Sequence, residues 1–192
     1  MSTDVWFLAA NASFDEFVAA FQPGDAGRDF GDGQTLLHRA LTNGDLSARV
    51  AISSFLLDEG ADATALSGVG GERNTVLHAL LGRGDHDVRA EVPLLRRLIE
   101  AGADINHFSG RFRTPLLTIA RQAKFSDATL APFYDVFFEQ PHLDLRATAK
   151  DGRSVYESIQ LMREPHRSDL KRRAAAYLAE RGQHAPETPA KE

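Results

Sequence analysis

The sequence contains no cysteine, so disulfide bonds and every form of cysteine chemistry are excluded. The N-terminal stretch also lacks lysine and arginine, since the first of either is Arg28. A secretory signal begins with a positively charged region, and none is present here. Both absences fit a reducing compartment, and we expect a cytoplasmic protein.

Long apolar runs are missing as well. Stretches such as 53–57 and 115–120 are interrupted within a few residues, whereas a membrane-spanning helix needs roughly 18 apolar residues in succession. The formal net charge of −5 at pH 7 argues against nucleic acid as the main ligand, because phosphate binding requires clustered positive charge. The sequence therefore predicts a chain without a membrane span whose main partner is not nucleic acid.

Catalytic signatures are also absent. The chain contains no GxGxxG, P-loop, HExxH or GxSxG motif. No nucleophile, base and orienting group form a recognisable constellation. We therefore expect a protein that is not an enzyme and that uses no cofactor or metal.

An internal repeat dominates what is present. Four segments align, beginning at positions 35, 75, 114 and 154, which are 40, 39 and 40 residues apart. The segments are Thr35-Leu36-Leu37-His38, Thr75-Val76-Leu77-His78, Thr114-Pro115-Leu116-Leu117 and Ser154-Val155-Tyr156-Glu157. A hydroxyl residue before apolar residues can cap a helix, and Pro115 suits a first turn, where its missing N–H is harmless. Each segment therefore predicts the start of an inner helix.

A second series of segments alternates with the first. Two are closely similar, at 56–62 (LLDEGAD) and 98–104 (LIEAGAD), and a weaker one lies at 137–144. Gly60 and Gly102 follow apolar runs and suit the left-handed residue just past a helix end. These segments predict the end of an outer helix. The connectors that follow, such as 67–74, are rich in turn-forming residues and predict hairpin-like turns.

A unit of helix, loop, helix and turn whose halves read TxLH and LLxxGAD resembles the ankyrin repeat over nearly the whole chain, and Asn106 completes the family's GADxN pattern. The resemblance implies an all-α fold, an ankyrin-repeat solenoid of about five helix-turn-helix repeats with hairpin-like connectors. The family period is about 33 residues, shorter than the one here. We expect the extra residues in the connection between the two helices of a repeat or in a longer outer helix.

The repeats predict one ankyrin-repeat domain over residues 1–184, with approximate repeats at 1–30, 31–70, 71–109, 110–149 and 150–184. In the first repeat, residues 5–13 predict a degenerate helix. Phe14, Phe17, Val18 and Phe21 lie at helical spacing and predict a second one. The stretch 185–192 has two prolines and little to bury, so it predicts a disordered C-terminal tail.

Seven histidines raise the question of a metal or catalytic site. The resemblance implies that His38 and His78, the last residues of the TxLH segments, form hydrogen bonds that tie neighbouring turns together. Asp85, His86 and Asp87 form a compact polar cluster in a predicted loop, and two carboxylates with an imidazole suit a divalent metal. Because adjacent residues rarely converge on one ion, we expect a solvated loop instead.

The resemblance also implies a binding surface, the concave side built from connector tips and the exposed face of the inner helices. Projected onto this sequence, that side collects eight of the 22 basic residues, and one phenylalanine between them is expected to be an exposed aromatic contact. The predicted partner-binding residues are Arg39, Arg73, Arg83, Arg111, Phe112, Arg113, Arg121, Lys150 and Arg153. They predict a locally basic groove for a partner protein with an acidic surface.

The sequence thus predicts a monomeric protein–protein interaction module, and its residues do not distinguish a scaffold from a regulator. One alternative is an inhibitor or immunity-type protein for a cognate toxin or enzyme, which suits a small free-standing solenoid. Another is a polyanion or nucleic-acid binder that uses the same arginines. A simpler alternative is that these arginines only pair with acids of neighbouring repeats, of which Asp32, Glu72 and Asp151 lie on the same side.

Overall fold

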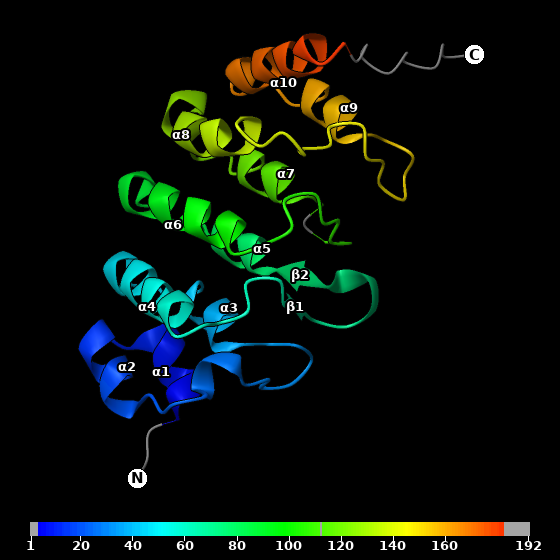
Figure 1. Cartoon of the computed structure of the whole chain (residues 1–192). Helices are drawn as coiled ribbons and strands as arrows, with labels where there is room; N and C mark the ends of the chain where they lie inside the picture. The colour runs from blue at the N-terminus through cyan, green and yellow to red at the C-terminus, as the bar shows by residue number, and fades with distance from the viewer. Residues whose placement is uncertain (1–3, 112, 183–192) are drawn as a thin grey trace.

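Figure 1 shows the computed structural model of the chain, which describes residues 4–111 and 113–182. The chain is mostly helical, as predicted. Its helices follow one another in pairs, and the pairs are stacked in chain order from the N-terminal end to the C-terminal end (Figure 1). The predicted disordered tail, 185–192, lies outside the described residues. None of the helices in the described part combines the length and the apolar character needed to cross a membrane.

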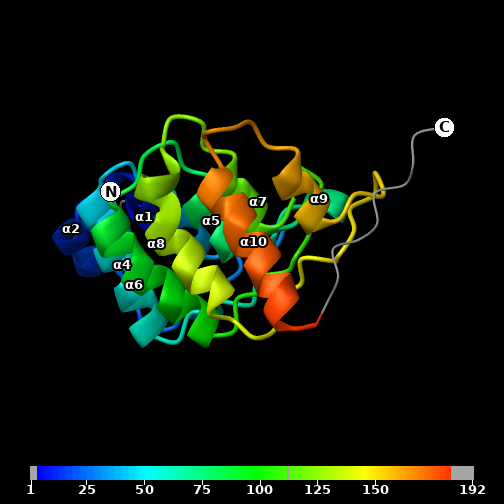
Figure 2. The same cartoon turned by 90° about the horizontal axis from the view of Figure 1, so that it is seen from above.

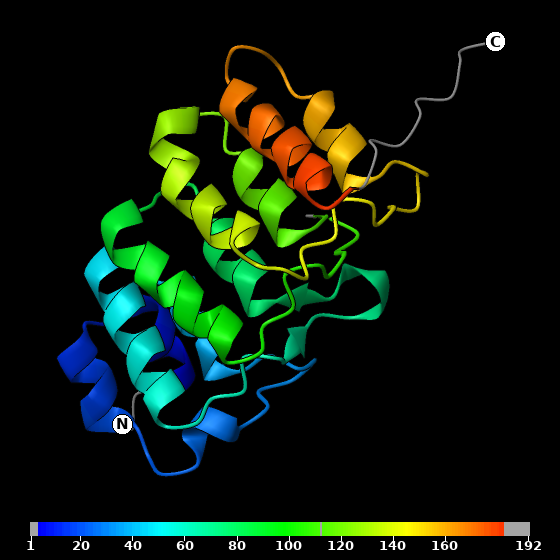
Figure 3. The ribbon, with the colours of Figure 1, turned by 45° about the horizontal axis from the view of Figure 1, so that its top comes forward.

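Each pair contributes one helix to each of two layers, which lie side by side when the stack is seen from above (Figure 2). The inner helices are α1 (Val5–Asn11), α3 (Leu36–Ala40), α5 (Val76–Leu81), α7 (Pro115–Ala120) and α9 (Val155–Gln160). The outer helices are α2 (Phe14–Ala20), α4 (Leu46–Asp58), α6 (Val88–Glu100), α8 (Asp127–Phe138) and α10 (Ser168–Glu180). Figure 3 shows the longer outer helices packed against one another in the order in which they occur along the chain.

The predicted helix signals are confirmed. The hydroxyl groups of Thr35, Thr114 and Ser154 each accept a hydrogen bond from a backbone N–H in the first turn of α3, α7 and α9. Gly60 and Gly102 follow the outer helices α4 and α6 with φ of 81° and 97°, a left-handed conformation that favours glycine. The repeat thus begins and ends its helices where local chemistry dictates.

The long outer helices and the connectors account for the long repeat period. Most of the chain between Gly44 and Gly60 is helix, because α4 occupies 13 residues there, and α6 also has 13. The connector before α5 is an antiparallel hairpin of β1 (Leu66–Ser67) and β2 (Asn74–Thr75), with a short 3-10 turn, η2 (Gly70–Glu72), between the strands. A similar turn, η1 (Asp25–Gly27), precedes α3. A hairpin-like connector is therefore confirmed before α5.

One continuous hydrophobic core lies between the layers. It includes Leu36 and Leu77 from inner helices and Leu56 and Leu98 from outer helices, all with 0% exposure. Burying a side chain of this size stabilises a fold by about 1.5–3 kcal/mol. Because this core runs the length of the stack, it holds the inner helices at fixed spacing and so positions the residues they present.

Candidate functional site

The predicted basic residues lie on one side of the stack. We call the side formed by α3, α5, α7, α9 and the connectors before them the inner face. Phe112 lies outside the described residues. Three hollows on the described inner face collect most of the others: Arg39 and Arg83 line the first, Arg113 and Lys150 the second, and Arg113, Arg121 and Arg153 the third.

The first hollow, the Arg39–Arg83 hollow, lies between α3 and α5 and has a volume of about 280 Å³. The Arg39 guanidinium lies over the ring of Trp6, 5.4 Å from its centroid, a favourable cation–π contact. Within the described residues the only ion pair of Arg83 joins its Nε to Asp85 Oδ1 at 3.7 Å. Neither guanidinium donates a hydrogen bond to any described group, and the Nε atom of each is buried.

The second hollow lies across the connector tips and has a volume of about 320 Å³. Arg113 Nη2 donates to Asp151 Oδ2 at 2.6 Å, and this hydrogen bond is the main cause that lowers the pKa of Asp151 to about 2. Arg113 is therefore paired with an acid of the next connector, as the simpler alternative expected. Lys150 is exposed beside this pair and forms no ion pair in the part of the chain described.

The third hollow, the Arg121–Arg153 hollow, lies between α7 and α9 and has a volume of about 210 Å³. Arg121 follows the end of α7, and Arg153 precedes α9. Both side chains are exposed, and neither forms an ion pair or a side-chain hydrogen bond with residues 4–111 or 113–182. Met162 and Leu161, which is 68% exposed, line the same hollow. This hollow therefore combines two exposed arginines that form no ion pair in the described part of the chain with accessible apolar surface.

Two predicted residues lie outside these hollows. Arg73 uses its guanidinium within its own connector, where Nη2 donates to the carbonyl oxygen of Leu66 at 3.3 Å. Arg111 is exposed at the tip of the next connector, and its backbone N–H donates to Ser109 Oγ. The predicted cations are thus divided among separate hollows and connector tips.

His78 has the structural role that the resemblance implied. Its Nδ1 accepts a hydrogen bond from the backbone N–H of Thr75, and its Nε2 donates to the carbonyl oxygen of Arg113 at 2.7 Å. Burial lowers the pKa of His78 to about 4, so the ring is neutral at pH 7. This hydrogen bond ties α5 to the next connector and helps to hold Arg113, whose φ is 68°, in the left-handed conformation.

His38 differs from His78. Its Nδ1 lies 3.0 Å from Thr35 Oγ1. Its buried Nε2 makes no hydrogen bond of normal geometry to a described group, although the backbone carbonyls of Asn74 and Ala65 in the next connector act on the ring. Burial lowers the pKa of His38 to about 4, and the backbone carbonyls of Asn74 and Ala65 only partly offset this effect. His38 is therefore also neutral at pH 7, with an unsatisfied nitrogen at the Arg39–Arg83 hollow.

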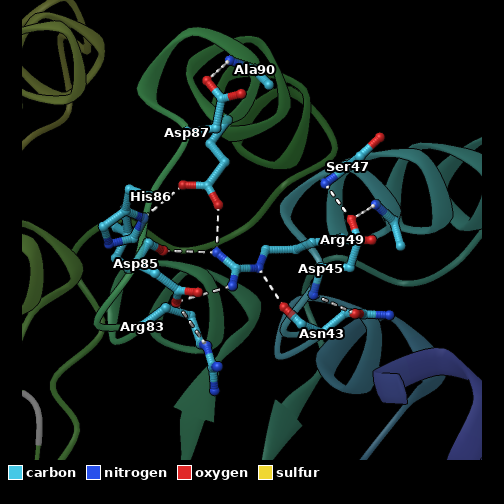
Figure 4. A network of polar contacts seen from close by, with 12 residues as sticks. Asn43, Asp45, Ser47, Arg49, Arg83, Asp85, His86, Asp87 and Ala90 are labelled. Carbon is cyan, nitrogen blue, oxygen red and sulfur yellow. Dashed lines mark hydrogen bonds and ion pairs between the residues drawn. The ribbon is translucent and has the colours of Figure 1, made fainter. Parts of the chain in front are cut away.

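A buried polar network, which sequence reasoning missed, fixes the loop beside this hollow (Figure 4). The side chains of Arg49, Glu91 and His86 are fully buried. Arg49 Nη1 donates to Glu91 Oε1 at 2.6 Å, and Arg49 Nε donates to the carbonyl oxygen of Asn43 at 2.9 Å. Arg49 Nη2 lies 3.2 Å from Asp85 Oδ1, and Asp85 in turn lies beside Arg83. The network therefore positions one cation of the Arg39–Arg83 hollow.

We expected Asp85, His86 and Asp87 to form a solvated loop, and this expectation is wrong for the His86 side chain, which is buried. His86 Nδ1 lies 2.6 Å from Glu91 Oε2, and the ring packs on Phe125, because the loop folds against the next repeat. The three side chains diverge: one contacts Arg49, one contacts Glu91, and Asp87 caps α6 (Figure 4). In the described part of the chain no three His, Asp or Glu side chains are grouped to hold a metal ion.

Comparisons with known proteins bear on the fold alone. No protein-family model matches this sequence, and no curated protein matches it. The structure is similar to the crystal structure of a functionally unknown protein from Leptotrichia buccalis C-1013-b, with a TM-score of 0.72 and 20% sequence identity. The match covers 94% of this chain and 96% of that chain. The two chains therefore share a mostly helical fold over nearly their whole length.

Proposed function

We propose that the chain is an ankyrin-type solenoid that holds another protein against its inner face. Support for the solenoid comes from helix pairs stacked in chain order, from Thr35 and Thr114 at the starts of inner helices, and from left-handed Gly60 and Gly102 after outer helices. Each pair contacts chiefly its neighbours in the chain, which is the packing expected of a repeat array. An array of this kind presents an extended surface, suited to binding a macromolecule.

The observation that carries the binding role is the Arg121–Arg153 hollow. Neither of its two arginines forms an ion pair within 4–111 and 113–182, although the chain has a net charge of −5 and therefore an excess of acids; Arg153 acts only through its field on Asp151 and Glu157, whose pKa values it helps to lower. Exposed Leu161 lies in the same hollow. Arginine beside apolar surface is typical of the residues that dominate protein interfaces, whereas solvated surface arginines need no apolar neighbour.

The test is site-directed photo-crosslinking in lysate of the native cells. One variant carries a photoreactive amino acid at Ser158, which lines the Arg121–Arg153 hollow, and a matched variant carries it at Arg89, an exposed residue of the outer helix α6. We expect a partner to crosslink from position 158 and not from position 89. Reversing charge with Arg121→Glu and Arg153→Glu together should abolish this crosslink.

The captured partner is then purified and its Kd measured. The double charge reversal should weaken binding by about tenfold or more, because each lost charge-assisted hydrogen bond is worth about 1.5–3 kcal/mol. Arg89→Glu reverses one charge on the outer side, half the change of charge in the double variant, and should leave Kd unchanged. Equal crosslinking from both positions, or equal loss of affinity in both variants, would contradict binding through the inner face.

A further inference from the structure

The Arg39–Arg83 hollow concentrates polar atoms that lack partners. Six buried side-chain nitrogen or oxygen atoms in residues 4–111 and 113–182 have no hydrogen bond, and four of them belong to residues lining this hollow. They are His38 Nε2, Arg39 Nε, Asn74 Oδ1 and Arg83 Nε. Buried polar groups of folded proteins are normally hydrogen-bonded, so such a concentration indicates a site whose partners come from another molecule.

Both arginines are oriented by contacts that leave their hydrogen-bonding groups unused. The Arg39 guanidinium lies over Trp6, which is itself stacked on Phe30 at a centroid distance of 4.9 Å. Arg83 lies beside Asp85, which the buried Arg49 holds at 3.2 Å. Two guanidinium groups held at one hollow, with donors unbonded, favour an anionic ligand and in particular a carboxylate, whose oxygens match their planar geometry.

Asn74 further restricts the chemical groups that a ligand of this hollow can carry. Its amide nitrogen donates to the carbonyl oxygen of Glu72 at 2.9 Å, which fixes the orientation of the amide and leaves Oδ1 as an unsatisfied acceptor. A ligand that fills the hollow must therefore bring a hydrogen-bond donor as well as negative charge. An acidic residue in a peptide has both, in its side-chain carboxylate and its main-chain N–H. A phosphodiester backbone has acceptors alone, so it matches the hollow less well.

We propose that the Arg39–Arg83 hollow binds the side chain of an aspartate or glutamate in an extended segment of the partner protein. The carboxylate lies between the two guanidinium groups, and a main-chain N–H of the same segment donates to Asn74 Oδ1. This assignment rests on the proposed protein-binding function and specifies the chemistry that the partner presents at one hollow of the inner face.

The test uses a library of random nonapeptides displayed on phage and joined to the coat protein through their C-termini, so that no free peptide carboxylate is present. The library is selected on the intact protein and, in parallel, on the Arg39→Ala/Arg83→Ala variant, with Arg89→Ala as the control. We expect peptides with one invariant acidic residue to be enriched on the intact protein and the control, and not on the double variant.

The best peptide is then synthesised with both ends blocked. Changing its acidic residue to the amide should weaken binding by about tenfold or more, as should the double alanine variant. Methylating the amide nitrogen that donates to Asn74 should weaken binding several-fold. Arg39→Lys/Arg83→Lys keeps the charge but removes the planar donors, so it should also lose affinity, and it serves in place of the alanine variant if that one fails to fold.

Selection without an invariant acidic residue, or equal binding by the double variant, overturns the assignment. So does displacement of the peptide by a mixed-sequence single-stranded oligonucleotide at equal concentration. These outcomes leave the proposed function standing if a partner still crosslinks at the Arg121–Arg153 hollow. Loss of that crosslinking with retained peptide selection would instead show that the proposed function is wrong while the hollow binds acidic peptides.

Discussion

Mild acidification should destabilise the fold through His38 and His78 before carboxyl groups titrate. Burial lowers the pKa of each ring from 6.5 to about 4, although Asp62 acts to raise the pKa of His38 and Asp104 that of His78. Because the folded-state pKa lies below the unfolded-state value, the unfolded chain binds more protons at acid pH. The contribution of the two neutral histidines to the free energy of unfolding is therefore complete above about pH 6.5, and it is lost as the pH falls toward about 4.

The two pKa values set how much the free energy of unfolding falls on acidification. Between about pH 7.5 and about pH 5, each histidine should reduce the free energy of unfolding by about 2 kcal/mol, and the pair by about 4 kcal/mol. That loss is a large share of a total stability of about 5–15 kcal/mol. Carboxyl groups with shifted pKa values, such as Asp85 and Asp151, shift downward, so their contribution is lost at lower pH and does not overlap this range.

The assay is urea unfolding followed by far-UV circular dichroism at several pH values in this range. His38→Gln and His78→Gln should each remove about half of the pH dependence, even though both variants are less stable at neutral pH. In the double variant the free energy of unfolding should be nearly independent of pH over this range. A wild-type free energy of unfolding that does not change across this range would refute the reasoning. So would a double variant that keeps the full wild-type slope, because the titrating groups would then lie elsewhere.

Three further changes test the packing by urea unfolding. Leu77→Ala removes a side chain with 0% exposure and should destabilise by about 2–5 kcal/mol; a change within error would count against the core. Arg49→Ala leaves Glu91 buried without its cation and should cost about 3–5 kcal/mol, of which Glu91→Gln in the same chain should recover part; no recovery would argue against the pair. Gly33→Ala should cost about 1–3 kcal/mol, because the new Cβ would lie 2.2 Å from the carbonyl oxygen of Leu66 and because residue 33 has a φ of 73°. A neutral result would contradict that close approach.

The starts and ends of helices were predictable because local chemistry decides them. Thr35 and Thr114 cap the inner helices through hydroxyl groups that precede the apolar run, and Gly60 and Gly102 end the outer helices because they tolerate a left-handed backbone. These effects act within one turn, so a single sequence contains them in full. The distribution of the predicted cations among separate hollows depends on side-chain packing between repeats, which local pattern does not specify.

The buried charges were not predicted, since a long charged side chain on a helix is ordinarily solvated. A signal for Arg49 was nevertheless present: Arg49 and Glu91 are both the fourth residue of their outer helices, α4 and α6, so opposite charges occupy equivalent positions in successive repeats. Arg167 has no such signal. Its buried guanidinium donates to the carbonyl oxygens of Ala120 and Gln122, more than 40 residues earlier in the chain, and no periodic pattern links them.

The stacking of helix pairs in chain order has an evolutionary consequence. Because each pair contacts chiefly the pair before it and the pair after it, a tandem duplication of residues 76–114 would insert one more unit between existing neighbours without altering the contacts within any unit. The molecule can therefore grow by copying part of its own gene. Each added unit lengthens the inner face by one inner helix and its connector, whose charged residues are free to diverge from those of the unit they were copied from.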